Sequence, residues 1–324
     1  MAEPLVVLLY SPRFVPNDAL EHLATRVPRG FRWQVLNQSA PTEERAAAFA
    51  AADYMFGYLG DPSPAELAVA RHLKLFQLLS AGYDWLDLEA FQRHGIPLAN
   101  NDGSNAVATA EHAVLLMLAM LRQLPRHHQS TASGEWLAMT HAMNLRELRG
   151  KIVGLIGFGQ IAREVARRVR AFDAEVRYTK PRPALPQQEQ PSGASYRTIE
   201  QLLAESDIVS LHAPLGPGTR GMIDAAALAR MRRGSWLVNT ARGGLVDESA
   251  LHAALASGHL AGAGLDVFAH EPIDPESPLL RLPNVVLTPH LAGSTRDTWD
   301  FRMDAAWDNV RRVAAGESPA ARIA

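Results

Sequence analysis

The sequence predicts an α/β fold with two doubly wound parallel-sheet domains, and three observations support this. Short apolar runs alternate with helical patterns almost from end to end, and most of these runs are apolar throughout. The series breaks once, at the turn-rich segment 100–105, and then resumes. Continuous apolar strands separated by helices are typical of parallel sheets that are covered on both faces.

The first series contains five predicted strands, which are separated by Ala- and Glu-rich segments such as 42–52 and 63–71. The composition of those segments is typical of helices. The strands are predicted over residues 5–10, 33–36, 55–58, 76–79 and 96–99.

The second series begins with a long apolar segment, Ala106–Leu121, which follows turn residues able to cap a helix. Because this helix is hydrophobic all round, we expect it to be buried, in part against a partner subunit, and hence a homodimer. We interpret Glu111 and His112, near its start, as structural or interfacial. After a polar stretch at 122–134, strands are predicted over 152–156, 175–178, 208–212, 236–239, 264–267 and 285–288.

Two more segments complete the chain. Residues 181–193 are rich in Pro and Gln and are predicted to form a surface loop, because strands resume on both sides. Residues 296–315 carry apolar side chains at three- and four-residue spacing, among them Trp299, Met303 and Trp307. This spacing predicts a helix that packs on one face, and we expect it to return to the first domain.

Composition and charge exclude several classes of protein. The chain has 324 residues, of which 47% are hydrophobic and 20% charged, as in ordinary folded proteins. Its formal charge of -2 offers no positive field to nucleic acids or acidic membranes. The most apolar stretch, 113–121, is shorter than the ~20 residues of a membrane span. With Cys 0 and with His127 and His128 on different helical faces, we expect no metal site. We therefore expect a cytoplasmic protein that binds a small polar molecule.

A predicted strand runs directly into the turn Gly157-Phe-Gly159-Gln-Ile-Ala162 and a helical pattern. This is the G-x-G-x-x-A pattern of a dinucleotide-binding turn, in the strand–turn–helix context that the pattern requires. Gly157 allows the tight turn, and Gly159 lets the backbone approach a pyrophosphate. The N–H groups at the helix start, at Gln160 and Ile161, then face the phosphates.

The end of the next strand distinguishes between two dinucleotides. About 20 residues after the glycines, an NAD enzyme usually places Asp or Glu on the ribose 2′-hydroxyl, whereas an NADP enzyme places a basic group nearby. The chain reads Arg177-Tyr-Thr179-Lys180-Pro-Arg182, without a carboxylate at the strand end. Thr179 does not repel a 2′-phosphate, and Lys180 and Arg182 carry the charge to pair with one. We expect NADP, with NAD as the alternative if both cations only solvate a loop.

Three later segments each place a polar side chain after a predicted strand, namely Arg242, Glu271 and His290. Because the carboxyl ends of parallel strands open on one crevice, we expect the three to converge beside the nicotinamide. Hydride addition to a ketone builds negative charge on its oxygen, which Arg242 and a protonated His290 stabilise. A carboxylate beside an imidazole favours the imidazolium form and orients the ring. The pattern therefore indicates an acid/base site.

Together with the glycine turn, these segments resemble the D-isomer-specific 2-hydroxyacid dehydrogenase family, with glyoxylate and hydroxypyruvate reductases as the nearest type. The resemblance covers nearly the whole chain, including the 80–84 loop and the 100–112 segment. It implies a Rossmann dinucleotide-binding domain, 103–293, inserted into a flavodoxin-like substrate-binding domain, 1–102. Residues 294–324 are then a C-terminal helix that returns to the substrate-binding domain.

The resemblance implies catalytic roles by position. Arg242 is expected to bind the substrate carboxylate and polarise the 2-oxo group. His290 is expected to donate the proton in reduction and to accept it in oxidation, while Glu271 holds His290. The backbone N–H groups of Ala81 and Gly82 are expected to bind the other side of the carboxylate.

The resemblance also implies further cofactor contacts. Asp266 is expected to meet the nicotinamide end of the cofactor, and Thr240 and Ala241 are counted among its contacts.

The first hypothesis for function is an NADP-preferring reductase of small 2-oxo acids, such as glyoxylate or hydroxypyruvate, to D-2-hydroxy acids. A phosphoglycerate dehydrogenase is the alternative within the family, which we expect less because the sequence ends at Ala324 without the regulatory domain that many such enzymes carry. An alternative of another class is an NAD(P)-sensing interaction protein like the family's co-repressors. Formate and phosphite dehydrogenases of the family carry Gln and Lys where this chain has Glu271 and Ala81, which argues against those substrates.

Overall fold

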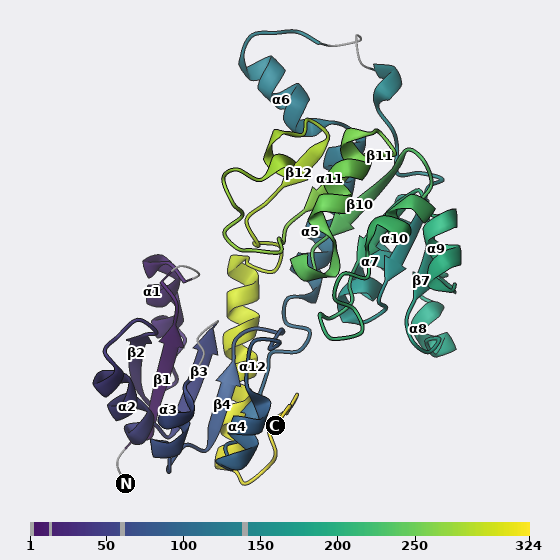
Figure 1. Cartoon of the computed structure of the whole chain (residues 1–324). Coiled ribbons are helices and arrows are strands. Elements are labelled where there is room, and N and C mark those ends of the chain that lie inside the picture. The colour runs from purple at the N-terminus through teal and green to yellow at the C-terminus, as the bar shows by residue number, and fades with distance from the viewer. Residues whose placement is uncertain (1–2, 13–14, 59–61, 138–141) are drawn as a thin grey trace. The chain divides into compact units, whose positions relative to one another are not determined.

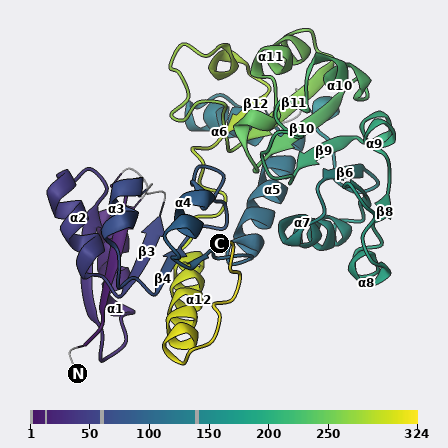
Figure 2. The ribbon, with the colours of Figure 1, turned by 60° about the horizontal axis from the view of Figure 1, so that its bottom comes forward.

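The computed structural model describes residues 3–12, 15–58, 62–137 and 142–324. The chain divides into two compact units, residues 1–105 with 295–324 and residues 106–294. Each unit is an α/β domain with its own parallel sheet (Figures 1 and 2). The predicted fold class, two doubly wound parallel-sheet domains, is confirmed.

The first unit is built on a five-stranded parallel sheet in the order β2-β1-β3-β4-β5, the flavodoxin-like order. Its strands are β1 (Leu5–Tyr10), β2 (Arg32–Asn37), β3 (Tyr54–Tyr58), β4 (Leu75–Leu78) and β5 (Leu98–Ala99). Its helices are α1 (Asn17–Thr25), α2 (Thr42–Ala51), α3 (Pro64–Val69), α4 (Leu88–Arg93) and α12 (Arg296–Ala314).

Side chains of β1 alternate between two cores, because successive residues of a strand point to opposite faces. Val7 and Leu9 belong to the core under α2, α3 and α4. Val6 and Leu8 belong to the core under α1 and α12, to which α12 contributes Trp299, Met303, Ala306, Trp307 and Val310. The last helix therefore packs on the sheet of the first unit.

The second unit contains a seven-stranded parallel sheet in the order β12-β11-β10-β9-β6-β7-β8. Its strands are β6 (Ile152–Ile156), β7 (Glu175–Thr179), β8 (Ser195–Tyr196), β9 (Ile208–Leu211), β10 (Ser235–Asn239), β11 (Leu260–Leu265) and β12 (Val285–Leu287). Chain order reverses between β6 and β9, which makes this the switch point where open α/β sheets bind ligands.

Helices cover both faces of this second sheet. The helices of this unit are α5 (Ala106–Leu121), α6 (Leu124–Ala132), α7 (Gln160–Arg170), α8 (Pro186–Glu189), α9 (Ile199–Glu205), α10 (Ala225–Arg230) and α11 (Glu248–Ala256), with 3-10 turns η1 (Ala142–Asn144), η2 (Gly243–Leu245) and η3 (Pro278–Arg281). One core holds α5 and α7, and the other holds α9, α10 and α11.

Helix α5 is buried along most of its length inside its own chain, although Val107 and Leu115 remain 49% and 51% exposed. No single helix among the described residues is long and apolar enough to cross a membrane. Helices α5 and α6 are long and apolar enough only when they are counted together, and they are bent by 65° at their junction.

The structure corrects two local expectations and adds one helix that was not predicted. Strand β11 covers Leu260–Leu265, whereas 264–267 was predicted. The polar stretch 122–134 contains helix α6, and the predicted loop 181–193 contains the short helix α8, which begins at Pro186. Both helices have proline in their first turn, where its missing N–H costs nothing.

Candidate active site

The glycine turn after β6 has the geometry that its sequence predicts. Gly157 has φ +95°, and a Cβ there would lie 2.5 Å from the carbonyl oxygen of His212, so only glycine fits. Gly157 N–H donates to the carbonyl of Thr179 at 2.9 Å, which joins the turn to the end of β7. A Cβ at Gly159 would meet open space, and α7 begins one residue later. The backbone at Gly159 is therefore accessible beside the helix start.

Aromatic stacking holds this turn in place. The rings of Phe158 and Tyr178 are stacked with centroids 4.0 Å apart. The Tyr178 hydroxyl accepts from Ala184 N–H at 2.7 Å and donates to the Glu189 carboxylate. Burial, with the neighbouring Glu189 carboxylate, raises the pKa of Tyr178 to about 12. The loop after β7 is thus attached to the turn.

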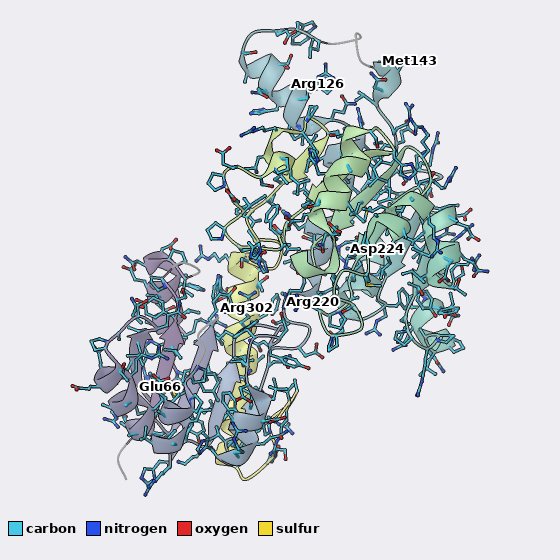
Figure 3. The ribbon with its side chains drawn as sticks, viewed as in Figure 1. Glu66, Arg126, Met143, Arg220, Asp224 and Arg302 are labelled. Atoms are coloured by element: carbon cyan, nitrogen blue, oxygen red, sulfur yellow. The ribbon has the colours of Figure 1, made fainter. Side chains whose placement is uncertain are left out.

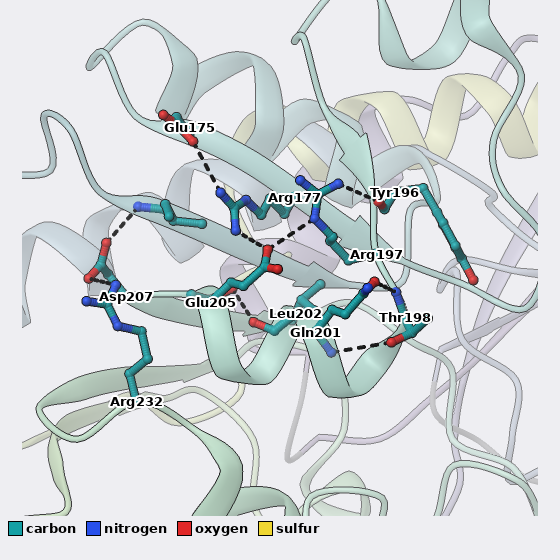
Figure 4. A network of polar contacts seen from close by, with 12 residues as sticks. Glu175, Arg177, Tyr196, Arg197, Thr198, Gln201, Leu202, Glu205, Asp207 and Arg232 are labelled. Atoms are coloured by element: carbon teal, nitrogen blue, oxygen red, sulfur yellow. Dashed lines mark hydrogen bonds and ion pairs between the residues drawn. The ribbon is translucent and has the colours of Figure 1, made fainter.

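Cations near β7 divide into two groups. Arg177 and Arg197 both form ion pairs with Glu205, in the network of Figure 4. Lys180 is half-buried and Arg182 is exposed, and neither forms an ion pair within the part of the chain that the structure describes. The buried Thr179 lies between the two groups at the end of β7. Two cations beside the turn therefore keep their charge uncompensated.

The predicted cofactor contact Thr240 is buried at the end of β10, beside Ala241. Its Oγ1 has no hydrogen-bond partner among the described residues. A buried hydroxyl without a partner is uncommon and costs free energy unless a ligand satisfies it. Together with the open space at Gly159, this hydroxyl fits a site that binds a polar ligand.

The loop that carries Arg242 is held by Asn239 and by close backbone packing. Asn239 is 1% exposed, and its side chain accepts from Ala241 N–H at 3.0 Å and donates to the Arg242 carbonyl at 2.9 Å. A Cβ on Gly243 would lie 1.9 Å from the carbonyl carbon of Phe268. The loops after β10 and β11 are therefore in direct contact.

Glu271 and His290 form a hydrogen-bonded pair, with Glu271 Oε2 2.6 Å from His290 Nδ1. The other carboxylate oxygen accepts from Phe268 N–H at 3.0 Å. Burial alone would raise the pKa of Glu271, but the hydrogen bonds and charges of His290, with smaller contributions from Phe268 and Arg242, hold it below its ordinary value. The structure thus brings Glu271 and His290 together, and the charge of Arg242 acts on the same Glu271 carboxylate.

Asp266 organises the loop that contains His290. Its buried carboxylate accepts from Leu291 N–H at 3.0 Å and from Ala292 N–H at 2.9 Å. Its backbone carbonyl accepts from His290 N–H at 2.7 Å. His290 has φ +54°, a left-handed conformation that a residue with a Cβ keeps only when its surroundings impose it. The expected contact of Asp266 with nicotinamide stays a prediction.

In the first unit, the loop that contains Ala81 and Gly82 is fixed through its carbonyl groups. Ser80 Oγ donates to the Gly82 carbonyl at 2.9 Å, and Asn100 Nδ2 donates to the Ala81 carbonyl at 2.7 Å. Asn101 N–H donates to the Ser80 carbonyl at 3.0 Å. Because the carbonyls are bound from the protein side, the shape of this loop is set by the domain itself.

Arg302 lies on α12 in the first unit (Figure 3). It is 3% exposed, and its guanidinium lies 4.8 Å from the ring centre of Trp299 and 5.2 Å from that of Tyr58. Burial lowers its pKa below the ordinary arginine value, against the opposing influence of Tyr58. Its carbonyl accepts from Asn101 Nδ2 at 3.0 Å, which connects α12 to the segment behind the Ala81 loop.

Sequence reasoning missed residues that hold the candidate loops, each within its own unit. Asn239 and Gly243 flank Arg242, but only the close approach of Phe268 shows what the glycine does. Arg302 carried no sequence signal, because a single arginine in an amphipathic helix is ordinarily exposed. Over the described ranges, no group of three or more His, Cys, Asp or Glu side chains could hold a metal ion.

Comparison with known proteins identifies relatives of the whole chain. Residues 114–292 match the family described as "D-isomer specific 2-hydroxyacid dehydrogenase, NAD binding domain". A glyoxylate reductase of Korarchaeum cryptofilum is 34% identical over 313 residues, which are 94% of this chain and 93% of that protein. A D-3-phosphoglycerate dehydrogenase of Archaeoglobus fulgidus is 40% identical over 231 residues, which are 71% of this chain but only 43% of that protein.

Solved structures show the same fold across the chain. The TT0316 protein of Thermus thermophilus has a TM-score of 0.84 at 34% identity and covers 98% of this chain, with 100% of its own length matched. A glyoxylate reductase from Paecilomyes thermophila has a TM-score of 0.83 at 30% identity, covering 99% of this chain and 98% of that one.

Proposed function

The chain belongs to the D-isomer specific 2-hydroxyacid dehydrogenase family, and on this premise we propose that it reduces a small 2-oxo acid to the D-2-hydroxy acid. Glyoxylate and hydroxypyruvate are the proposed substrates, with NADPH preferred over NADH. The observation that carries this proposal is the Glu271–His290 pair, 2.6 Å apart, with the charge of Arg242 acting on the same carboxylate.

Arg242 is assigned to the substrate carboxylate and the 2-oxo oxygen, and the N–H groups of Ala81 and Gly82 are assigned to the carboxylate as well. Negative charge grows on the 2-oxo oxygen as the carbonyl is reduced, so a guanidinium there stabilises the transition state more than the ground state. The nicotinamide cofactor, when bound, supplies the hydride.

His290 is assigned the proton transfer. Its Nδ1 meets Glu271, so Nε2 is the ring nitrogen that delivers a proton to the substrate oxygen in reduction and takes it back in oxidation. The hydrogen bond with Glu271 holds the plane of the His290 ring. The substrate carbonyl thereby gains one hydride and one proton and becomes the hydroxyl group.

For the cofactor, the proposed contacts follow the turn and the strand ends. The N–H groups of Gln160 and Ile161, at the start of α7, are assigned to the pyrophosphate, whose charge the helix N-terminus favours. Lys180 and Arg182 are assigned to the 2′-phosphate, because neither forms an ion pair in the described part of the chain.

A substrate panel with both reduced nicotinamides tests this function. We expect the purified chain to oxidise NADPH faster than NADH with glyoxylate or hydroxypyruvate. Faster turnover with 3-phosphohydroxypyruvate than with glyoxylate or hydroxypyruvate would favour the phosphoglycerate dehydrogenase alternative. The 40% identity to the Archaeoglobus fulgidus enzyme is the reason to include this substrate. Cofactor binding without turnover on any 2-oxo acid would contradict the proposal and favour a nucleotide-sensing protein.

A homodimer remains the proposed assembly. Beside the Glu111–Arg168 ion pair, α5 and the segment after α7 form a groove lined by Val114, Leu115, Leu118 and Phe172. Apolar surface of this kind is typical of contacts between subunits. Light scattering of the purified chain measures its mass directly, and a monomer at working concentrations would contradict this assignment.

A further inference from the structure

A series of polar contacts connects helix α5 to the loop of His290. Its first residue, His112, has no part in the proposed mechanism. His112 Nε2 lies 2.9 Å from Thr288 Oγ1, and Thr288 Oγ1 lies 2.6 Å from Asp266 Oδ1. The three side chains come from α5, from the residue after β12, and from the residue after β11. His112 has a side chain only 10% exposed and Asp266 one only 1% exposed.

Chemistry determines which way these hydrogen bonds point. A threonine hydroxyl has one proton, and the short contact with the Asp266 carboxylate uses it, because an ionised carboxylate only accepts. The contact between His112 and Thr288 must therefore be Nε2–H donating to the hydroxyl oxygen. His112 is therefore the first donor of this series, and its neutral ring must carry the proton on Nε2.

At its other end, this series of hydrogen bonds reaches the loop of His290, the proposed proton donor. Asp266 fixes three consecutive amides, because its carbonyl accepts from His290 and its carboxylate accepts from Leu291 and Ala292. A buried carboxylate is tolerated only when hydrogen bonds compensate its charge. The carboxylate in turn is oriented by the Thr288 hydroxyl, whose remaining partner is His112.

We propose that His112 is a positioning residue, which orients Asp266 through Thr288 and thereby holds His290 in its left-handed conformation beside Glu271. This inference rests on the proposed role of His290 in proton transfer. It assigns His112 no contact with substrate or cofactor.

The protonation of His112 agrees with this role. Burial lowers the pKa of His112 below its ordinary value, and the nearby Asp266 carboxylate opposes part of that effect. A neutral ring that donates through Nε2 is therefore the form present at neutral pH and above. A donor that carries no charge leaves the field at His290 unchanged, so its effect is on geometry.

The experiment compares two substitutions of one residue in the full-length chain. His112→Gln keeps an N–H donor at the position of Nε2, whereas His112→Leu keeps the bulk and removes the donor. We expect kcat for 2-oxo acid reduction to fall about tenfold in His112→Leu, since one buried acceptor loses its donor, and to return to near the original value in His112→Gln. The dissociation constant of the reduced cofactor should stay the same in both.

A matched control separates positioning from general destabilisation. His259 is half-buried in the same unit and meets the Leu228 carbonyl through Nε2 at 3.0 Å, far along the chain from the His290 loop. His259→Leu should lower thermal stability about as much as His112→Leu while leaving kcat unchanged. Equal kcat in His112→Leu and the unsubstituted chain, or no recovery in His112→Gln, would overturn the proposal.

Two further measurements test the inference even if His112→Leu folds poorly or the proposed reaction is wrong. Thr288→Val removes the hydroxyl at nearly constant shape, and it should reproduce the loss, with Thr288→Ser restoring activity. Crystal structures of the His112 variants report the separation of His290 Nδ1 and Glu271 Oε2, 2.6 Å in the original chain, without any substrate. If that separation is unchanged in His112→Leu, His112 does not position His290, whatever reaction the protein catalyses. If the unsubstituted chain reduces no 2-oxo acid, the proposed function is wrong, but the structural test of His112 still applies.

Discussion

The loops of Arg242 and His290 and the loop after β7 lie at the carboxyl edge of the same sheet, yet they are built differently. Around Arg242 and His290, buried Asn239 and Asp266 side chains hold the backbone, and Gly243 lets two loops pack in direct contact. Beyond β7, Lys180 and Arg182 extend from the chain without an ion pair in the described residues.

This difference separates two requirements. Proton transfer needs atoms in fixed positions, because a shift of about 1 Å costs a large factor in rate. Attraction of a phosphate needs only charge within reach, which a flexible side chain supplies. Substitutions in the catalytic loops should therefore change turnover by large factors, whereas substitutions after β7 should change the choice of cofactor by small ones.

The largest effect is expected in the loop of His290, which Asp266 holds. His290→Ala removes the proposed proton donor, and we expect kcat to fall on the order of 10²-fold or more. Cofactor binding, measured by fluorescence titration, should persist because the glycine turn is untouched. Near-normal turnover would remove His290 from the mechanism.

The next effect tests the contact between the two catalytic loops. Gly243→Ala places a methyl group against the backbone of Phe268, and we expect it to lower the free energy of unfolding by about 3 kcal/mol and to impair substrate binding by Arg242. Gly218→Ala is the control, since a Cβ there meets open space. Denaturant unfolding of both proteins measures the difference, and equal stability would mean that the loops are not tightly packed.

A smaller effect is expected when the carboxylate beside His290 loses its charge. Glu271→Gln removes the charged acceptor that meets His290 Nδ1 at 2.6 Å and orients the ring, so reduction should weaken about tenfold. Steady-state kcat is the measurement, and an unchanged kcat would contradict the pairing.

The same substitution has a consequence for stability. Because the pKa of Glu271 is held below its ordinary value of 4.5, the ionised carboxylate stabilises the fold above that pH, and this contribution is lost as the pH falls further. Unfolding midpoints between pH 6 and pH 3 should therefore fall less in Glu271→Gln than in the unsubstituted chain.

The last effect is expected at the two cations after β7, and it concerns the choice of cofactor rather than turnover. Replacing Lys180 and Arg182 together with Gln should weaken NADPH about tenfold and leave NADH nearly unchanged, because only the former carries the 2′-phosphate. Dissociation constants for both reduced cofactors provide the measurement. Equal losses would show that these two residues do not distinguish between the cofactors.

Features with a strong local pattern were predicted well. The bounds of α5 and β6 agree with the prediction, since a long apolar helix and a strand that ends in a glycine turn are marked by their own residues. The three side chains proposed as catalytic could be grouped because parallel strands present their carboxyl ends to one crevice.

Features that depend on distant neighbours were not predicted. The start of β11 reads Leu-Ala-Gly-Ala, a poor strand sequence, and its glycines have a tertiary cause. A Cβ on Gly264 would lie 2.9 Å from the Cβ of Leu116 in α5, and one on Gly262 would lie 2.6 Å from the carbonyl oxygen of Asn284. The contact of His112 with Thr288 was not predicted for the same reason, because Thr288 and Asp266 are remote from it in sequence.

A crystal structure of the chain with NADP⁺ and a non-reducible 2-oxo acid analogue such as oxamate tests the central claim most directly. The account predicts the analogue's carboxylate on the Arg242 guanidinium and its carbonyl oxygen within hydrogen-bond distance of His290 Nε2, with Nδ1 still on Glu271. An analogue bound away from Arg242, or a His290 ring turned from it, would contradict the account.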